Sequence, residues 1–192
     1  GEVYTYKDST IRKVNHVDTE DLWKYKSTIK KIVFEDYFRK IEDAVEVFDI
    51  SSEQNGGVLV YIIGENGGYT AYIQGDGKII ANPDSSYLFD RFTSLEVIEG
   101  IENLDTSQVT NMSHMFGRCR NLITVNLSSF DTSNVTDMSY MFHDCVSLTK
   151  GDLSHLNVSN VKTMQGMFEG CSQLKEVNFP VEGLPNVDNM KD

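Results

Sequence analysis

The chain has little positive charge and no long apolar segment. It holds 17 basic residues against 29 acidic ones, giving a net charge of −12, and the basic residues form no stripe. This composition argues against a nucleic-acid partner and against electrostatic attachment to an anionic membrane. No apolar run approaches the roughly 20 residues of a membrane span, and we expect no signal peptide within these residues, which is compatible with one that has been removed. We therefore expect no membrane insertion of this region.

Proline and cysteine are also scarce, with three of each among 192 residues, and there is one tryptophan. The cysteines nevertheless recur at a fixed interval of 26 residues, and methionines and phenylalanines keep the same interval. The recurring positions are Cys119, Cys145 and Cys171; Met112, Met138, Met164 and Met190; Met115, Met141 and Met167; and Phe116, Phe142 and Phe168. A period of this length is typical of proteins that stack one short unit many times.

The periodicity divides the second part of the chain into units. Unit one covers 105–130, unit two 131–156 and unit three 157–182, with a degenerate unit before them at 82–104 and a partial unit after them at 183–192 that includes Asn186, Val187 and Met190. Apolar residues spaced i, i+3, i+6, i+7 and i+10 from Val109 to Cys119 predict a helix of about three turns. Thr110, Asn134 and Thr136 are of the type that caps helix N-termini.

After each cysteine the spacing changes to L-x-x-L-x-L, as in Leu122, Val125 and Leu127, which predicts a short strand. Stacked units would place these strands side by side in a parallel sheet with the helices behind it. The sequence therefore predicts an α/β solenoid over residues 82–192, a stack of short parallel strands and short helices.

Residues 1–81 do not repeat and read as a β-rich cap segment. Apolar runs at 45–50, 58–63, 69–74 and 78–81 alternate with Gly-rich turns, which is typical of a meander of hairpins. Residues 29–34 reproduce the strand spacing of the units, so this segment is a candidate for the first strand of the stack. The alternative is an amphipathic helix from Ile29 to Val45, and we favour the strand.

The repeated phrase resembles the BspA-like leucine-rich-repeat surface proteins of bacteria, in the subgroup with a 26-residue unit. It stands here as LDTSQVTNMSHMF in Leu104–Phe116 and as DTSNVTDMSYMF in Asp131–Phe142, while unit three departs from it at Asn157, Val158 and Lys162. The resemblance extends from about Gly75 to Met190. It implies a leucine-rich-repeat-like fold and a secreted or wall-anchored bacterial protein with an adhesion or host-contact role. It also implies no catalytic residues and no cofactor.

The residues that flank the inward-facing positions of each predicted strand should point outward. We take this exposed surface as the candidate ligand-binding site, because stacked repeats commonly bind partners through such sheets. Its members are Thr124, Asn126, Lys150, Asp152, Glu176 and Asn178. The alternative interpretation is an ordinary solvated polar face, since the surface lacks the aromatic and arginine residues that dominate most interfaces.

Cysteine and histidine suggest no metal site. Equivalent repeat positions would place the three thiols in a file, whereas a tetrahedral zinc site needs convergent ligands. We favour buried free thiols, with a disulfide between neighbouring units as the alternative. For His16, His114, His143 and His155, a solvated imidazole is favoured over a metal ligand. No Ser-His-Asp grouping follows from spacing, so we expect no enzyme and no cofactor.

The sequence therefore predicts a monomeric, extracellular bacterial interaction module, at the cell surface or secreted, whose partner is a surface protein or a glycan of host or bacterium. The alternative is a structural spacer or stalk section of a larger surface protein, with recognition located elsewhere. The chain starts at Gly1 without a methionine and stops inside a unit, as expected of a fragment.

Overall fold

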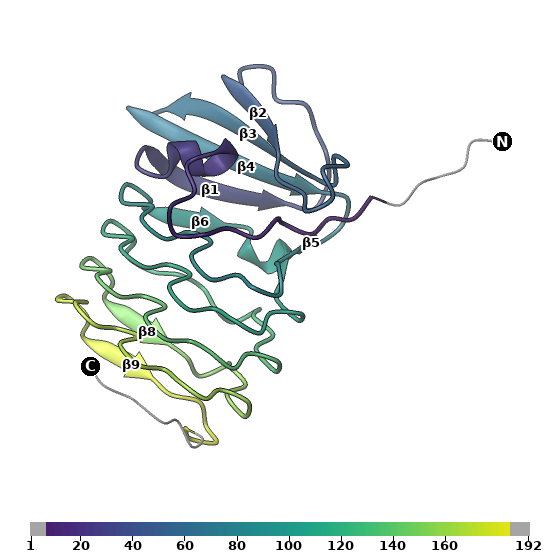
Figure 1. Ribbon diagram of the computed structural model, residues 1–192. Coiled ribbons are helices and arrows are strands. Elements are labelled where there is room, and N and C mark those ends of the chain that lie inside the picture. The colour runs from purple at the N-terminus through teal and green to yellow at the C-terminus, as the bar shows by residue number, and fades with distance from the viewer. Residues whose placement is uncertain (1–6, 185–192) are drawn as a thin grey trace.

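The computed structural model describes residues 7–184 and is mostly β. Figure 1 shows two parts that follow each other along the chain: a twisted sheet built by the N-terminal residues, and a pile of irregular turns built by the repeats. The sheet has five strands in the order β2–β3–β4–β1–β6. Their bounds are Ile29–Glu35 for β1, Glu46–Asp49 for β2, Val58–Glu65 for β3, Gly68–Gly75 for β4 and Val97–Glu99 for β6.

This sheet confirms the strands expected at 29–34, 45–50, 58–63 and 69–74, whereas the run at 78–81 forms a short strand outside it. β2, β3 and β4 pair antiparallel as a meander, and β1 confirms the strand at 29–34 over the alternative helix. β1 joins β4 on one side and β6 of the degenerate unit on the other, both in parallel. The β3–β4 turn places Asn66 and Gly67 at φ values of 51° and 76°, a conformation that glycine and asparagine tolerate best.

The remaining elements are short. β5 (Ile79–Ile80) pairs with β7 (Leu104–Asp105), and β8 (Lys150–Asp152) pairs with β9 (Glu176–Asn178), both in parallel. Within residues 7–184 the helical segments are two 3-10 turns, η1 (Asp21–Tyr25) and η2 (Ile101–Asn103). None of the helices in this part of the chain is long and apolar enough to cross a bilayer.

The predicted α/β solenoid is wrong, because the described units contain no α-helix. In unit one, His114 and Arg118 have φ values of 57° and 58°, and Tyr140 and Asp144 repeat this in unit two at 56° and 57°. A left-handed residue ends an α-helix, so two per unit leave only turns. The predicted strands also form only in part: β8 and β9 are present, but Leu122–Leu127 of unit one is not a strand.

Backbone groups that a helix would pair internally are instead paired between units. The amides of Met112 and Phe116 donate to the carbonyls of Asp137 and Met141, each at 2.9 Å. In the next pair of units, the amide of Phe142 donates to the carbonyl of Met167 at 2.9 Å. Each unit therefore needs its neighbour to satisfy its backbone, since an unpaired buried amide is costly.

Threonine and asparagine side chains of the repeated phrase bridge the units rather than cap helices. Thr132 is 1% exposed, and its hydroxyl donates to the carbonyl of Asn157 at 2.8 Å while accepting from the amide of Asn157 at 2.9 Å. The side chains of the three residues expected as caps donate hydrogen bonds to backbone carbonyls of the preceding unit. Thr110 donates to Pro83, Thr136 to Thr110, and Asn134 to Ser107.

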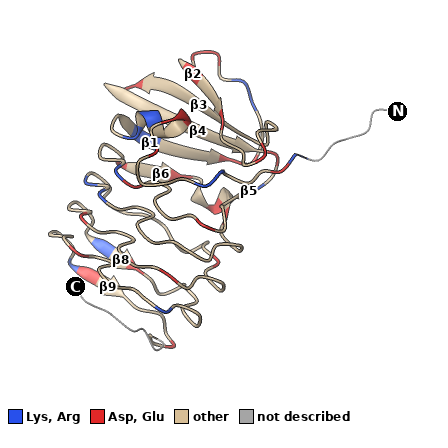
Figure 2. Cartoon of the chain, in the orientation of Figure 1, with Lys and Arg blue, Asp and Glu red and all other residues tan. Residues whose placement is uncertain are grey.

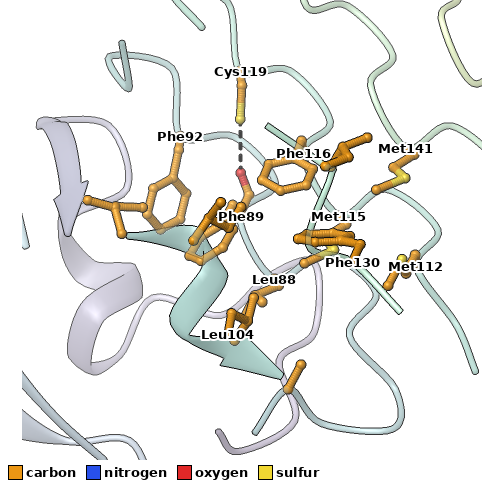
Figure 3. Close-up of a cluster of buried hydrophobic side chains, with 14 of the residues drawn as sticks. Leu88, Phe89, Phe92, Leu104, Met112, Met115, Phe116, Cys119, Phe130 and Met141 are labelled. Carbon is orange, nitrogen blue, oxygen red and sulfur yellow. Dashed lines mark hydrogen bonds between the residues drawn. The ribbon is translucent and has the colours of Figure 1, made fainter. Parts of the chain in front are cut away.

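Side chains at equivalent positions form columns in the core. Phe116 and Phe142 stack with ring centroids 5.3 Å apart, and Phe89 and Phe168 extend the column at either end. Beside this column, the thiol of Cys119 donates to the carbonyl of Phe89 at 3.2 Å, as Figure 3 shows. The Trp23 indole donates to the carbonyl of Leu88 at 2.8 Å, which ties the N-terminal segment to the degenerate unit.

The bridging role of Thr132 can be measured. Thr132→Val keeps the shape but leaves the amide and carbonyl of Asn157 without this partner, so the free energy of unfolding should fall by about 1–3 kcal/mol. Chemical denaturation measures the change. Ser133→Ala serves as the control: it removes a hydroxyl that bonds Asp131 at 2.6 Å within its own turn and bridges no units, so it should cost less than about 1 kcal/mol. Equal stability of both variants would contradict the bridging role.

Candidate interaction surface

The structure brings the predicted ligand-binding residues together on adjacent segments, which we call the six-residue surface (Thr124, Asn126, Lys150, Asp152, Glu176 and Asn178). Lys150 on β8 lies opposite Glu176 on β9, and Asp152 lies opposite Asn178. Figure 2 shows the two strands side by side; β8 carries one charge of each sign, Lys150 and Asp152, and β9 carries the negative charge of Glu176. Lys150, Asp152 and Glu176 are exposed, as the alternation predicted.

A polar hollow of about 220 Å³ forms where unit one meets unit two. It is lined by Thr124, Val125, Asn126, Leu127, Ser128, Lys150, Asp152 and His155. Four members of the six-residue surface therefore border one hollow, whereas Glu176 and Asn178 do not line it. Its lining offers hydroxyl, amide, ammonium and carboxylate groups, so it can exchange hydrogen bonds with a polar ligand.

Two of these lining residues also hold the backbone. Asn126 accepts the amide of Ser128 at 3.0 Å, and Asp152 accepts both the amide and the hydroxyl of Ser154, at 3.0 and 2.6 Å. Such turns end the strand-like segment of each unit. The hydrogen bonds from Ser154 lower the pKa of Asp152, so its carboxylate is charged at neutral pH.

Asn178 differs from its two equivalents. The residue two positions later is Pro180, which has no N–H to donate, whereas serine stands there after Asn126 and Asp152. Within the described part of the chain, Asn178 Oδ1 is buried and has no hydrogen-bond partner. The prediction that Asn178 faces outward is therefore wrong for this oxygen, and Asn178 is only partly exposed.

A second hollow of about 470 Å³ lies between the turns of units two and three. It is lined by residues 154–159 and 180–184, which include the apolar side chains of Leu156, Val158 and Val181. His155 borders both hollows and is exposed. Its position three residues after Asp152 is the sequence signal that could have placed His155 beside β8.

The predicted solvation of the histidines is correct for two of them and wrong for two. His16 and His155 are exposed, but His143 is 8% exposed and His114 is only partly accessible. His114 Nδ1 lies 3.2 Å from His143 Nε2, so the two imidazoles share a hydrogen bond. Their positions are not equivalent in the repeat, and this concealed the contact at the level of sequence.

The three cysteines are free, as predicted, and each thiol donates to the carbonyl of a phenylalanine in the preceding unit. Cys119 and Cys145 are buried, while Cys171 is partly exposed. Burial raises the pKa of the Cys171 thiol to about 11, so it stays protonated at neutral pH. Across residues 7–184 no three His, Cys, Asp or Glu side chains form a group that could hold a metal ion.

These features define a mostly β protein built from repeat units that are hydrogen-bonded in series. The chain belongs to the family described as Mycoplasma protein of unknown function, DUF285, whose family model matches residues 84–192. This match starts in the degenerate unit and covers more than half of the 192 residues. Comparison with curated proteins and with solved structures found no match.

The position of β8 depends on Gly151, and this dependence can be tested. Units one and three have Val125 and Val177 at the equivalent position, but a Cβ on Gly151 would lie 2.6 Å from the ring of Phe168. Although Gly151→Val matches the other units, it should therefore destabilise the chain by about 1–3 kcal/mol. Phe168→Leu in the same chain should recover part of the loss in chemical denaturation. A single variant as stable as the parent chain would refute this account of β8.

Proposed function

We propose that the chain is a non-enzymatic interaction module of a bacterial cell-surface or secreted protein, of the BspA-like type. In this proposal the module is a monomer that presents the six-residue surface and its hollow to a protein or glycan partner, in an adhesion or host-contact role. It performs no chemistry and needs no cofactor. Its extracellular location follows from the resemblance of the repeated phrase to BspA-like surface proteins.

This proposal rests on a comparison of residue types at equivalent positions of the units: buried positions between units are nearly the same, and exposed strand positions differ. Positions that hold the units together are nearly invariant within the chain: the Phe column is identical in units one to three, and Thr106 and Thr132 make the same bridges. The exposed strand position, in contrast, carries threonine, lysine and glutamate in turn, at residues 124, 150 and 176. Conserved contacts between units combined with varied exposed residues are suited to recognition of a partner.

The chemistry of the hollow favours a polar partner. Lys150 and Asp152 offer opposite charges on one strand, and Thr124, Asn126 and Ser128 add neutral donors and acceptors. The volume of about 220 Å³ is smaller than that of most drug-sized ligand pockets, which measure roughly 300–1,000 Å³. The hollow therefore suits one sugar ring or one polar side chain of a larger partner, with further contacts along β8 and β9.

Binding can be tested without changing net charge. The double variant Lys150→Glu/Glu176→Lys exchanges the charges of two residues that lie opposite each other, so the cross-strand pair and the net charge are kept. A separate triple variant adds Asp152→Asn, which keeps an acceptor for Ser154 but makes the net charge one unit less negative. On arrays of glycans and surface proteins, any partner that the parent chain binds should be bound at least about tenfold more weakly by these variants, since charge complementarity is lost.

The control exchanges two other exposed charges of the repeat region, Lys162→Glu/Glu169→Lys, and should bind within about twofold of the parent chain. Melting temperatures of all variants should agree within about 2 °C, because surface changes of this kind rarely exceed 0.5 kcal/mol. Normal binding by the Lys150/Glu176 variant would remove the six-residue surface as the site. A parent chain that binds nothing on either array would instead favour a spacer.

A further inference from the structure

Four titratable side chains from three successive units meet at one place, which we call the histidine junction (Asp90, His114, His143 and Asp144). Asp90 belongs to the degenerate unit, His114 to unit one, and His143 and Asp144 to unit two. None of them lines the hollow of the six-residue surface. The junction therefore lies outside the surface that the proposed function uses.

His114 is held between two aromatic rings. Its imidazole stacks on Tyr87 at a centroid distance of 4.6 Å and on Tyr140 at 5.1 Å, with interplanar angles of 11° and 19°. Tyr87, His114 and Tyr140 occupy the same place in successive units and share the left-handed backbone, with φ values of 63°, 57° and 56°. His114 thus occupies the place that tyrosine holds in the units on either side.

His143 lies edge-on to this stack and contacts acidic groups on both sides. Its Nε2 is 3.2 Å from His114 Nδ1 and 4.0 Å from Asp90 Oδ1, and its Nδ1 is 3.4 Å from Asp144 Oδ2. Asp90 is 5% exposed, and its Oδ1 has no hydrogen-bond partner among the described residues. A Cβ on Gly117 would lie 2.6 Å from both Asp90 Oδ1 and His143 Nε2, so only glycine leaves room for this approach.

The nitrogen–nitrogen contact limits how many protons the pair can carry. One of the two facing nitrogens must carry a hydrogen and the other must accept it. With one added proton on the pair the contact can persist, because one of the two facing nitrogens can still accept. A second one would place two N–H groups and two positive charges against each other at 3.2 Å, which breaks the contact.

Of the charged groups around the junction, some raise and others lower the pKa values of His114 and Asp90. Those facing the junction are His16, Lys26, Arg91, Arg118 and Asp137. Burial, with His143 and Arg118, lowers the pKa of His114 to about 4, and burial raises the pKa of Asp90. The tyrosine faces offset part of the cost of a charged His114, since aromatic rings attract cations.

We propose that the histidine junction makes the packing of the degenerate unit, unit one and unit two sensitive to acid. In this account, a second proton on the His114–His143 pair breaks their contact and loosens the backbone bonds between the three units. Above about pH 6.5 the pair keeps its contact and contributes its full stability. As the pH falls from 6.5 toward 4, the unfolded chain takes up a proton on His114 that the folded chain resists, so stability is lost.

The protonation of Asp90 has the opposite effect on stability to that of His114 as the pH falls. Because its pKa is raised in the folded chain, the folded state takes up this proton more readily than the unfolded state, and the contribution of Asp90 improves as the pH falls. Asp90→Asn removes this compensation. The acid sensitivity should therefore increase in Asp90→Asn and decrease when His114 is replaced.

The test compares melting temperatures at pH 7.0 and 4.5 at constant ionic strength. His114→Tyr installs the residue of the two equivalent positions, and His114→Asn keeps an amide and tolerates the left-handed backbone. The drop in melting temperature between the two pH values should be about 2–6 °C smaller in both variants than in the parent chain. The exposed-histidine control, His155→Asn, should show the drop of the parent chain. An equal drop in all four proteins would overturn the proposal.

A local measurement distinguishes the junction from general acid unfolding. The amides of His114, Phe116 and Arg118 donate to carbonyls of unit two, at Ser139, Met141 and His143. At pH 5 their hydrogen exchange should be at least about threefold faster in the parent chain than in His114→Tyr. The amide of Leu153, which donates to Asn178 between units two and three, should exchange equally in both proteins. Equal rates at all four amides would also overturn the proposal.

Discussion

Hydrogen bonds between consecutive units are the constraint on which the rest of this structure depends. Because His114, Tyr140 and their equivalents adopt left-handed backbone, no α-helix can satisfy the amides of a unit from within. The amides therefore reach the next unit, and Thr106 and Thr132 close the remaining gaps. A single unit has no partner for these groups, so the repeats are stable only together, and the sheet at one end extends the same continuous core.

This constraint explains which parts of the fold were predictable. The 26-residue interval gave the columns correctly, since Phe116, Phe142 and the three thiols do recur in register. The prediction of helices was wrong because consecutive turns can also place one apolar side chain each in the core. Their apolar spacing is then nearly the same as that of a helix. The strand at 29–34 was separable from a helix because its spacing matched the units, and it pairs with the strand of the degenerate unit.

The candidate site was predictable where it follows strand alternation. Lys150, Asp152 and Glu176 face outward on adjacent strands because side chains alternate along a strand. The hollow was not predictable, since residue spacing does not determine how the unit-one segment, which is not a strand, lies beside β8. Two local details also escaped the pattern: Pro180 removes the donor that Asn178 would need, and the ring of Phe168 fills the space that valine occupies in other units. In both cases one unit differs from the others, and a prediction from the common repeat pattern does not include such differences.

The two proposals concern the same pair of units, and the geometry connects them. The hollow is bordered by Thr124 and Asn126 from unit one and by Lys150 and Asp152 from unit two, so its shape depends on how these units are held together. The contact between His114 and His143 joins the same two units through other segments of each. In a series of units where each contacts only its neighbours, a change at one joint acts first on features that span that joint. Opening the histidine junction would therefore alter the hollow before it altered the pairing of β8 with β9.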